Sequence, residues 1–278
     1  MISRESPAKV NLYLRVLRKR EDGYHDILSL MQRISLCDEL TFTRTGSGIA
    51  VHCPGTTLPE DEDNIVYRAA AAFYSRIGAS PEIEIAIRKR IPIAAGLGGG
   101  SSNAATTLMT LNEMYGSPVT PEELMKIGTG LGADVPFFIF GKTAWASGIG
   151  DRFQESPLLP PLWFVLINPG FEISTKMVYQ GLNLGLTKQG INYSIPRFST
   201  TEDLIRGLTN DLESVTTRLH PVLDQIKALL LKSGAQGALM SGSGPTVFGV
   251  FTDGESAERA KINLVQETRW LLFGAQSL

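Results

Sequence analysis

The sequence predicts a protein that combines strands with helices and divides into two domains. Apolar side chains alternate with other residues at 8–16 and 82–88, which is the pattern of half-buried strands. Apolar side chains recur three and four positions apart at 65–77 and 104–114, which is the pattern of amphipathic helices. The chain has 278 residues, enough for two modest domains, and the Gly- and Pro-bearing stretch at 150–161 indicates a linker. We therefore expect one domain at residues 1–155 and a second at 156–278.

Composition restricts the classes of function. The chain is 43% hydrophobic and 19% charged, which is typical of a globular protein. Its net charge of −2 offers no general attraction for nucleic acid, so local groups must bind any phosphate-bearing ligand. Cys37 and Cys53 form no C-x-x-C and no Cys/His cluster, which argues against a zinc site or a disulfide framework. The chain has neither a signal-peptide core nor a long apolar run. We expect a cytoplasmic monomer or weak homodimer that binds neither nucleic acid nor membrane.

The first part of the chain reads mainly as strands. Lys9 and Asn11 project from the polar side of the first strand, where they could simply face solvent. Asp22-Gly23 is a tight-turn signal, and the flanking runs suit a hairpin that carries Tyr24 and His25. Asp63 or Asn64 can cap the helix that Gly78 ends. Three further strands are expected at residues 27–32, 36–43 and 49–53.

A glycine-rich segment at residues 92–103 lies between a strand and a helix. Ser101 or Ser102 can cap this helix, and Gly116 can end it. The first turn of a helix has N–H groups without intrahelical partners and carries the positive end of the dipole, so anions suit it. Four glycines in five positions let the backbone approach a polyphosphate. The segment matches neither the P-loop nor the dinucleotide fingerprint, and its simplest alternative is a flexible turn.

The remaining elements follow in order. Thr120-Pro121-Glu122-Glu123 is a capping box with proline at the first helical position, and the helix ends among Gly128, Gly130 and Gly132. Asp134, an Asx-turn candidate, then precedes an apolar run at 137–140 that we assign to a strand. The later elements are strands at 143–148, 163–168 and 270–273, a short helix capped by Ser174-Thr175, helices at 199–207, 211–232 (broken at Pro221) and 255–267, and a second glycine-rich loop within 238–248.

The segment from Pro92 resembles the phosphate-binding signature P-x-x-x-G-L-G of the GHMP kinases. The variant G-L-G-G-G-S-S-N-A-A resembles one branch, the kinases of 4-diphosphocytidyl-2-C-methyl-D-erythritol. The resemblance implies an α+β fold of two domains with the active site between them. It implies a ribosomal-S5-domain-2-like N-terminal domain and a ferredoxin-like C-terminal domain. The second glycine loop resembles the third GHMP motif, which packs against the phosphate loop.

The resemblance also implies roles for particular residues. Lys9-Val-Asn11 matches an early K-x-N motif that faces the active site, and the G-x-D-V-P-F-F motif makes Asp134 the catalytic carboxylate. R-x-D-G-Y-H places Tyr24 on the face of the cytosine and His25 at its edge. The implied catalytic residues are Lys9 and Asp134. The implied substrate contacts are Asn11, Tyr24, His25, Thr175 and Tyr179. The implied nucleotide contacts are Asn64, Pro92, Ile93, Ala94, Ala95, Gly96, Leu97, Gly98, Gly99, Gly100, Ser101 and Ser102.

The implied reaction is transfer of the γ-phosphoryl group of ATP to the 2-hydroxyl of 4-(cytidine 5′-diphospho)-2-C-methyl-D-erythritol, in the non-mevalonate route to isoprenoid precursors. Positioning and charge neutralisation do most of the work in such a transfer. Mg²⁺ is expected with ATP, and its protein ligands stay unassigned.

Three alternatives stay open at this point. Another GHMP kinase, acting on homoserine or mevalonate, should lack the early K-x-N and the D-G-Y-H pair. A serine hydrolase built on Ser101 or Ser243 would need G-x-S-x-G, which neither serine has. A non-catalytic nucleotide- or RNA-binding module shares the fold of the N-terminal half, but the acidic balance and the Lys9/Asp134 pair argue against it.

Overall fold

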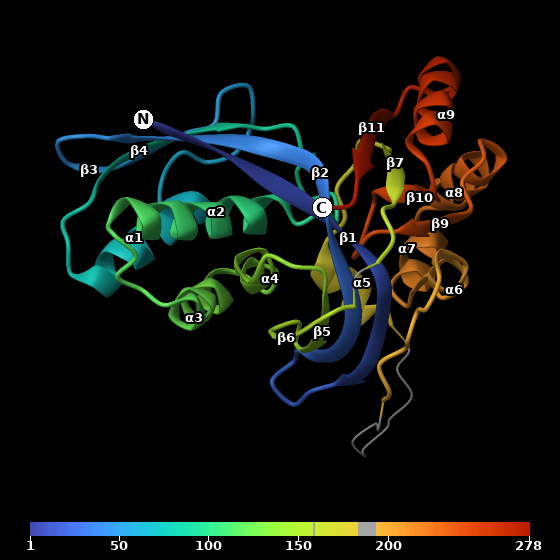
Figure 1. Ribbon diagram of the computed structural model, residues 1–278, viewed down its shortest axis with the longest axis horizontal. Helices are drawn as coiled ribbons and strands as arrows, with labels where there is room; N and C mark the ends of the chain where they lie inside the picture. Colours follow the sequence, from blue (N-terminus) through green and yellow to red (C-terminus); the bar gives the residue numbers. More distant parts are fainter. Residues whose placement is uncertain (158, 183–192) are drawn as a thin grey trace. The chain divides into compact units, whose positions relative to one another are not determined.

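The computed structural model describes residues 1–157, 159–182 and 193–278 (Figure 1). The chain forms two compact units whose segments alternate along the sequence. Unit 1 holds residues 1–8, 37–92 and 98–142, and unit 2 holds residues 9–36, 93–97 and 143–278. Both units combine strands and helices, so the expected mixture of α and β structure is confirmed. The expected domain boundary after residue 155 falls inside unit 2, and Leu158 of the expected linker lies outside the described residues.

Two long strands contribute residues to both units. They are β1 (Ile2–Lys19) and β2 (His25–Arg44), which join at the predicted hairpin turn. The expected strands at 27–32 and 36–43 are therefore one continuous strand. Polar residues such as Gln32, Arg33 and Ser35 interrupt the apolar pattern without ending the backbone ladder. Their side chains find partners: Gln32 Nε2 donates to the Leu278 carbonyl at 2.9 Å, and Ser35 Oγ accepts from Gln276 N at 3.0 Å.

Unit 1 places helices over a sheet. The strand β3 (Gly48–His52) pairs in parallel with β4 (Glu82–Arg88), which pairs antiparallel with residues 39–44 of β2. The helices α1 (Ile65–Ile77), α2 (Gly99–Met114), α3 (Pro121–Leu131) and α4 (Val135–Phe140) pack against one another (Figure 1). The expected caps Asn64, Gly78 and Thr120 are all observed. Helix α3 ends within the expected glycine-rich stretch: Gly128 and Gly130 lie in its last turns and Gly132 is its C-cap.

The apolar run at 137–140 forms the end of helix α4, so the expected strand is wrong. An apolar run this short has no clear period, and its secondary structure depends on what packs against it. Gly128 permits the helix here because a Cβ on Gly128 would lie 2.9 Å from Val135 Cγ1 and 3.1 Å from Ile139 Cδ1. The close approach of α3 and α4 therefore depends on that glycine.

Unit 2 is built on an antiparallel sheet in the order β11 (Leu271–Gln276), β7 (Trp163–Asn168), β10 (Val247–Phe251) and β9 (Gly237–Met240). The helices α8 (Val222–Lys232) and α9 (Gly254–Glu267) pack on this sheet (Figure 1). Pro221 separates α8 from α7, as expected, and Ser174 caps α5. The other elements of unit 2 are β5 (Ala144–Gly148), β6 (Arg152–Glu155), β8 (Thr209–Asn210), α5 (Thr175–Gln180), α6 (Thr201–Arg206) and α7 (Glu213–Leu219).

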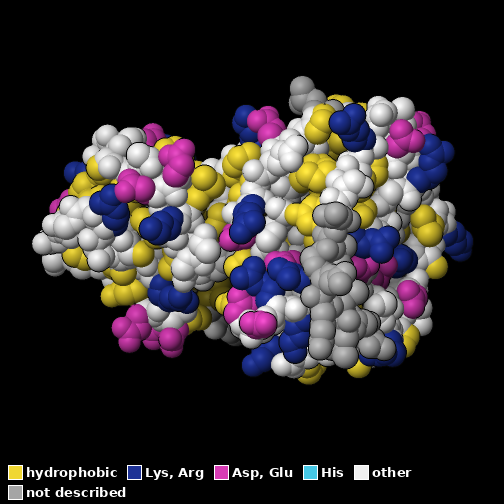
Figure 2. Space-filling model, turned by 90° about the horizontal axis from the view of Figure 1, so that it is seen from below, with side chains coloured by type: hydrophobic (Ala, Val, Ile, Leu, Met, Phe, Trp, Pro, Cys, Tyr) yellow, Lys and Arg dark blue, Asp and Glu magenta, His cyan; other side chains and the backbone are white. Residues whose placement is uncertain are grey.

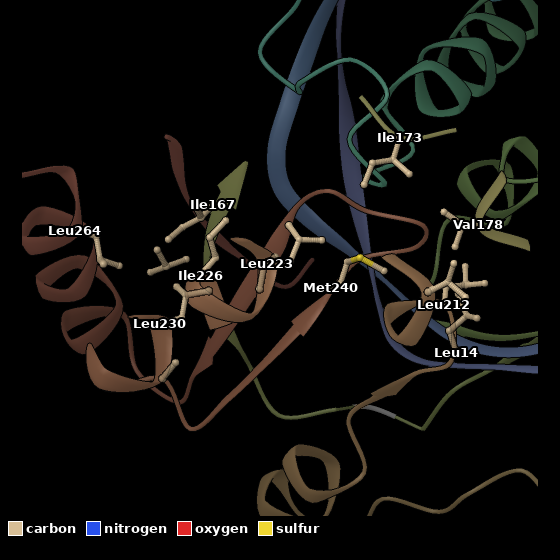
Figure 3. Packing of buried hydrophobic residues seen from close by; sticks show 14 of the residues in the cluster. Leu14, Ile167, Ile173, Val178, Leu212, Leu223, Ile226, Leu230, Met240 and Leu264 are labelled. Carbon is tan, nitrogen blue, oxygen red and sulfur yellow. The ribbon is translucent and has the colours of Figure 1, made fainter. Parts of the chain in front are cut away.

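A cluster of buried apolar side chains stabilises unit 2 (Figure 3). Most of its members come from β1, β2, β7, β10, α5, α7, α8 and α9, and Met240 at the end of β9 belongs to it. Truncating a buried leucine in such a cluster to alanine costs about 2–5 kcal/mol. The cluster therefore anchors both β1 and the start of the loop that follows Met240.

Surface charge is mixed in sign. On the face shown in Figure 2, Lys and Arg side chains alternate with Asp and Glu side chains, which limits any long-range field of one sign. In the part of the chain that the structure describes, the helices fall short of the length and apolarity that crossing a bilayer requires.

Candidate active site

Lys9 and Asn11 lie on the same side of β1, as the alternation predicted, but both are buried and do not face solvent. Their side chains are 3% exposed, and Lys9 Nζ donates to Asn11 Oδ1 at 2.7 Å. Asn11 Nδ2 donates to Ser29 Oγ at 2.8 Å, and Ser29 Oγ donates to the Tyr13 carbonyl at 2.8 Å. This polar row crosses from β1 to β2 and fixes the direction of the ammonium group. The sequence analysis did not identify Ser29. The feature that could have indicated it is a small polar residue within an apolar strand.

The first half of the glycine-rich segment, residues 93–97, packs within unit 2. Lys9 N donates to the Leu97 carbonyl at 2.9 Å, which ties the segment to β1. Ser241 Oγ donates to the Gly96 carbonyl at 2.9 Å, and Thr246 N donates to the Ala95 carbonyl at 3.3 Å. The second glycine loop, residues 241–246, therefore packs against the first, as expected. Gly96 has a φ of +77°, and a Cβ there would lie 2.2 Å from the Ser241 carbonyl oxygen, so only glycine fits.

The second half of the segment starts helix α2 within unit 1. The N-cap is Gly98 with a φ of +70°, and no side chain caps the helix, so the expected Ser101 or Ser102 cap is wrong. Glycine in the left-handed conformation starts the helix three residues earlier than a serine cap would. The first intrahelical bond runs from Ser102 N to the Gly98 carbonyl at 2.8 Å. The N–H groups of Gly99, Gly100 and Ser101 precede it and have no intrahelical acceptor.

Ser102 is fully buried, and Ser6 Oγ lies 2.8 Å from its Oγ. Its hydroxyl therefore faces the protein, whereas Ser101 next to it is half-buried. The sequence made no distinction between these two serines. Pro92 is half-buried, Ala95 and Leu97 are buried, and Ile93 and Ala94 are exposed.

Asp134 lies at the start of α4 in unit 1. It occupies the N-cap position, but its side chain makes no capping hydrogen bond. A Cβ on Gly132, two residues earlier, would lie 3.7 Å from Ser101 Oγ, and α4 packs against α2. The turn that carries Asp134 therefore lies beside the first turn of α2. Within unit 1, the segment that carries Asp134 is thus held next to the start of α2.

A buried ion pair supports the same helix start. Lys89 and Asp38 pair with side chains that are 9% and 0% exposed. Asp38 Oδ1 also accepts from Arg90 N at 2.8 Å and Ile91 N at 2.9 Å. Lys89 Nζ lies 3.2 Å from the position that a Cβ on Gly99 would occupy. Sequence reasoning missed this pair because 51 residues separate its members.

The residues expected to hold cytidine lie in unit 2. The rings of His25 and Tyr179 are 4.9 Å apart between centroids and tilted by 31°, so the structure brings these two together. Tyr24 is 60% exposed, and its N–H donates to Asp22 Oδ1 at 3.0 Å, which fixes the turn. Burial, aided by the charge of Lys19, lowers the pKa of His25 below its usual value.

Thr175 is joined to the second glycine loop. Its Oγ1 lies 2.8 Å from Ser243 Oγ. Thr175 and Tyr179 are four residues apart in α5 and therefore share one face of that helix. The short helix thus links the aromatic pair to the loop that packs on Gly96.

Asn64 is buried, and its side chain has several protein partners. Its Oδ1 accepts from Val66 N at 2.9 Å, and its Nδ2 donates to the Pro59 carbonyl at 2.6 Å. These contacts explain its position as a helix cap, and its expected contact with adenine stays a prediction. Within residues 1–157, 159–182 and 193–278, no three His, Cys, Asp or Glu side chains are grouped as a metal site would require.

Two family models match the chain in succession. Residues 64–142 match the GHMP kinases N terminal domain, and residues 195–267 match the GHMP kinases C terminal domain.

Curated relatives are similar over almost their whole length. A 4-diphosphocytidyl-2-C-methyl-D-erythritol kinase of Syntrophus aciditrophicus is 58% identical over 273 residues, which is 98% of each chain. The enzyme of the same name from Syntrophotalea carbinolica is 52% identical and aligns with 98% of this chain and 97% of its own. A crystal structure of 4-(cytidine 5′-diphospho)-2C-methyl-D-erythritol kinase superposes with a TM-score of 0.83, 36% identity and full coverage of both chains. A homoserine kinase from Cytophaga hutchinsonii superposes with a TM-score of 0.71 at 20% identity, covering 99% of this chain and 94% of its own, and shares the fold.

Proposed function

The chain belongs to the GHMP kinases, and we propose that it transfers the γ-phosphoryl group of ATP to the 2-hydroxyl of 4-(cytidine 5′-diphospho)-2-C-methyl-D-erythritol. The products are the 2-phosphate and ADP, on the non-mevalonate route to isoprenoid precursors. The observation that supports this choice of substrate is the contact between the His25 and Tyr179 rings. Homoserine and mevalonate have no base that such a pair could hold.

The first turn of α2 is the proposed site of the ATP phosphates. The N–H groups of Gly99, Gly100 and Ser101 and the positive end of the helix dipole suit a polyphosphate. The ammonium of Lys89 lies behind Gly99, where its buried partner Asp38 fixes its position. Mg²⁺, when bound with the nucleotide, neutralises phosphate charge. Such an ion usually keeps several waters and few protein ligands.

Asp134 and Lys9 are the proposed catalytic residues. The carboxylate of Asp134 accepts or orients the proton of the attacking hydroxyl. The ammonium of Lys9, held by Asn11, offsets the negative charge that develops during transfer. The hydroxyl oxygen forms a bond to the γ-phosphorus as the bond between that phosphorus and the bridging oxygen of ADP breaks.

The cytidine is proposed to lie against Tyr24, His25 and Tyr179. Aromatic side chains bind single bases by stacking, at about 1–3 kcal/mol per base. A neutral imidazole has one donor and one acceptor for the edge of the cytosine, and the lowered pKa of His25 favours that neutral form. Thr175 and Asn11 are proposed as further substrate contacts.

The protein is proposed to work in the cytoplasm as a monomer or weak homodimer. Cys37 and Cys53 are both buried thiols, which suits a reducing compartment.

A coupled assay of ADP release tests the function. The purified chain is supplied with ATP, Mg²⁺ and one alcohol at a time: the cytidine-diphospho substrate, mevalonate or homoserine. We expect turnover with the first alone, and the product should carry its new phosphate on the 2-hydroxyl by phosphorus NMR. Faster turnover of mevalonate or homoserine would replace the proposal by the other GHMP activity.

The variant Tyr24→Ala tests the base contact. Because Tyr24 is exposed, its loss should leave the free energy of unfolding unchanged. We expect KM for the cytidine substrate to rise about tenfold or more and KM for ATP to stay constant. Equal increases in both KM values would contradict the assignment. The matched control is Tyr67→Ala, since Tyr67 lies on α1 in unit 1 and has no proposed role.

A further inference from the structure

Asn210 lies in the short strand β8, which is held along β1. The backbone of β8 pairs in parallel with β1, with Leu14 opposite Asn210. The next residue extends the attachment: Asp211 N donates to the Leu14 carbonyl at 3.0 Å, and Val16 N donates to Asp211 Oδ2 at 2.9 Å. The strand that carries Lys9 and Asn11 therefore fixes the position of Asn210.

The side chain of Asn210 reaches from β8 to the second glycine loop. Its Nδ2 donates to the Met240 carbonyl at 2.8 Å and to the Gly242 carbonyl at 2.7 Å. Its Oδ1 accepts from Leu212 N at 3.0 Å. The amide is 6% exposed and uses both of its hydrogens. With both donors occupied, it is suited to hold the loop rather than to bind a ligand.

The loop that Asn210 holds forms one wall around the lysine. Gly242 has a φ of +56°, and a Cβ on it would lie 3.5 Å from Lys9 Nζ and 3.5 Å from Asn11 Oδ1. The same position is 3.2 Å from the Gly96 carbonyl oxygen. The backbone of Gly242 thus faces the lysine, its asparagine partner and the first glycine loop together. A shift of this loop changes the space in which Lys9 acts.

Two residues that follow Asn210 in the chain also hold the second glycine loop. Met240 N donates to Glu213 Oε1 at 3.1 Å, and Thr216 Oγ1 donates to the Ser243 carbonyl at 3.3 Å. Leu212, Leu14 and Met240 belong to one buried cluster, and Figure 3 shows Met240 between Leu223 and the pair Leu212 and Leu14. The segment 210–216 therefore connects β1 to the loop through hydrogen bonds and apolar packing.

We infer that Asn210 is a positioning residue for the phosphoryl transfer: it holds the loop at Gly242 against Lys9 and Asn11. The inference rests on the proposed function, because it says that Asn210 keeps Lys9 in the position that its proposed catalytic role requires. Asparagine is required because both of its contacts to the loop are donated N–H groups. An aspartate has the same shape, but the carboxylate oxygen in place of Nδ2 would face the two carbonyl oxygens of Met240 and Gly242 without a hydrogen to donate.

The test compares Asn210→Asp with Asn112→Asp. Asn112 is a buried asparagine of unit 1 that holds another turn, donating to the Val119 carbonyl at 2.9 Å and accepting from Val119 N at 3.0 Å. Both variants lose a buried donor, so thermal unfolding should reveal a loss of stability in each. We expect kcat with the cytidine substrate to fall about 10- to 100-fold in Asn210→Asp alone, because small misplacements of catalytic groups have such effects.

Two further measurements separate positioning from stability. In the Lys9→Met background, Asn210→Asp should cause little further loss in single-turnover rate, because both changes act through the same group. Hydrogen exchange of the amides at 240–246 should speed up in Asn210→Asp and stay constant in Asn112→Asp.

Equal kcat values in the two asparagine variants, or fully additive losses with Lys9→Met, would overturn the inference. A wild-type chain without activity on the cytidine substrate would instead overturn the proposed function. The exchange measurement would still report whether Asn210 holds the loop.

Discussion

Lys9 Nζ donates a hydrogen bond of 2.7 Å to Asn11 Oδ1, and both side chains are buried. The two residues are neighbours on one side of β1, so the strand itself sets their separation. Ser29 then fixes the amide of Asn11 from β2. These hydrogen bonds fix the direction of the ammonium group, which is what the proposed electrostatic role of Lys9 requires.

Replacing Lys9 by Met should abolish most of the turnover and keep the fold. We expect kcat to fall about 100- to 1,000-fold, because a fixed positive group is lost while a side chain of similar size remains. Circular dichroism and a cooperative thermal transition check the fold. Lys261→Met is the control: Lys261 pairs with Glu258 on the surface of α9, and its loss should change stability by less than about 1 kcal/mol. Wild-type kcat in Lys9→Met would exclude the assigned role.

Two aspartates at helix N-termini should behave in opposite ways. Asp134 makes no capping bond to α4, whereas Asp253 Oδ1 accepts from Ser256 N at 2.7 Å and caps α9. Asp134→Ala should lower kcat about 100- to 10,000-fold, as expected for loss of a general base. Asp253→Ala should lower the free energy of unfolding, because the cap of α9 is lost, and leave kcat unchanged. Urea unfolding and steady-state kinetics on both variants provide the comparison, and a normal kcat in Asp134→Ala would refute the catalytic assignment.

Gly96 and Gly116 have almost the same backbone conformation but different surroundings. Their φ angles are +77° and +78°, and alanine at either position costs about 1–2 kcal/mol in backbone strain. Only at Gly96 would the new Cβ meet a neighbour, the Ser241 carbonyl oxygen at 2.2 Å. Gly96→Ala should therefore displace the segment and reduce kcat/KM for ATP by about tenfold or more, while Gly116→Ala should not. Equal kcat/KM values for the two variants would show that the contact between the glycine loops is unimportant for nucleotide use.

The pH dependence of cytidine binding should follow His25. Its folded-state pKa is lowered, chiefly by burial and also by Lys19, so as pH falls the unfolded chain binds the proton first. The stability that His25 contributes is therefore complete above about pH 6.5 and is lost as pH falls through its folded pKa. KM for the cytidine substrate should be constant from about pH 8 to about pH 6.5 and rise at lower pH. His25→Gln, which cannot titrate, should remove this rise; the same rise in His25→Gln would assign the titration to another group.

Local chemistry explains which elements could be predicted. Asn64, Thr120 and Ser174 cap helices as expected, because each cap is a hydrogen bond to a backbone N–H two or three residues along the chain. The alternation of β1 placed Lys9 and Asn11 on one side of a strand for the same reason: the period is a property of the backbone. The resemblance of the motifs led to the family that both family models match.

Other features depended on contacts between distant residues. The apolar run at 137–140 is helical and belongs to α4, which packs closely against Gly128 of α3. Ser29, 18 residues from Asn11, and Asn210, 30 residues from Met240, gained their roles when strands were brought together. The residues next to Ser29 and Asn210 in the sequence do not indicate that these side chains bind Asn11 and Met240.

The caps of α1, α3 and α5 and the faces of β1 follow from interactions within a few residues, so the amino-acid order alone predicted them. The burial of Lys9, the glycine cap of α2 and the contact of Asn210 with Gly242 were decided only by the folded chain. Hydrogen bonding and close packing between remote segments create these features, and no pattern within a single segment encodes which remote segment it will meet.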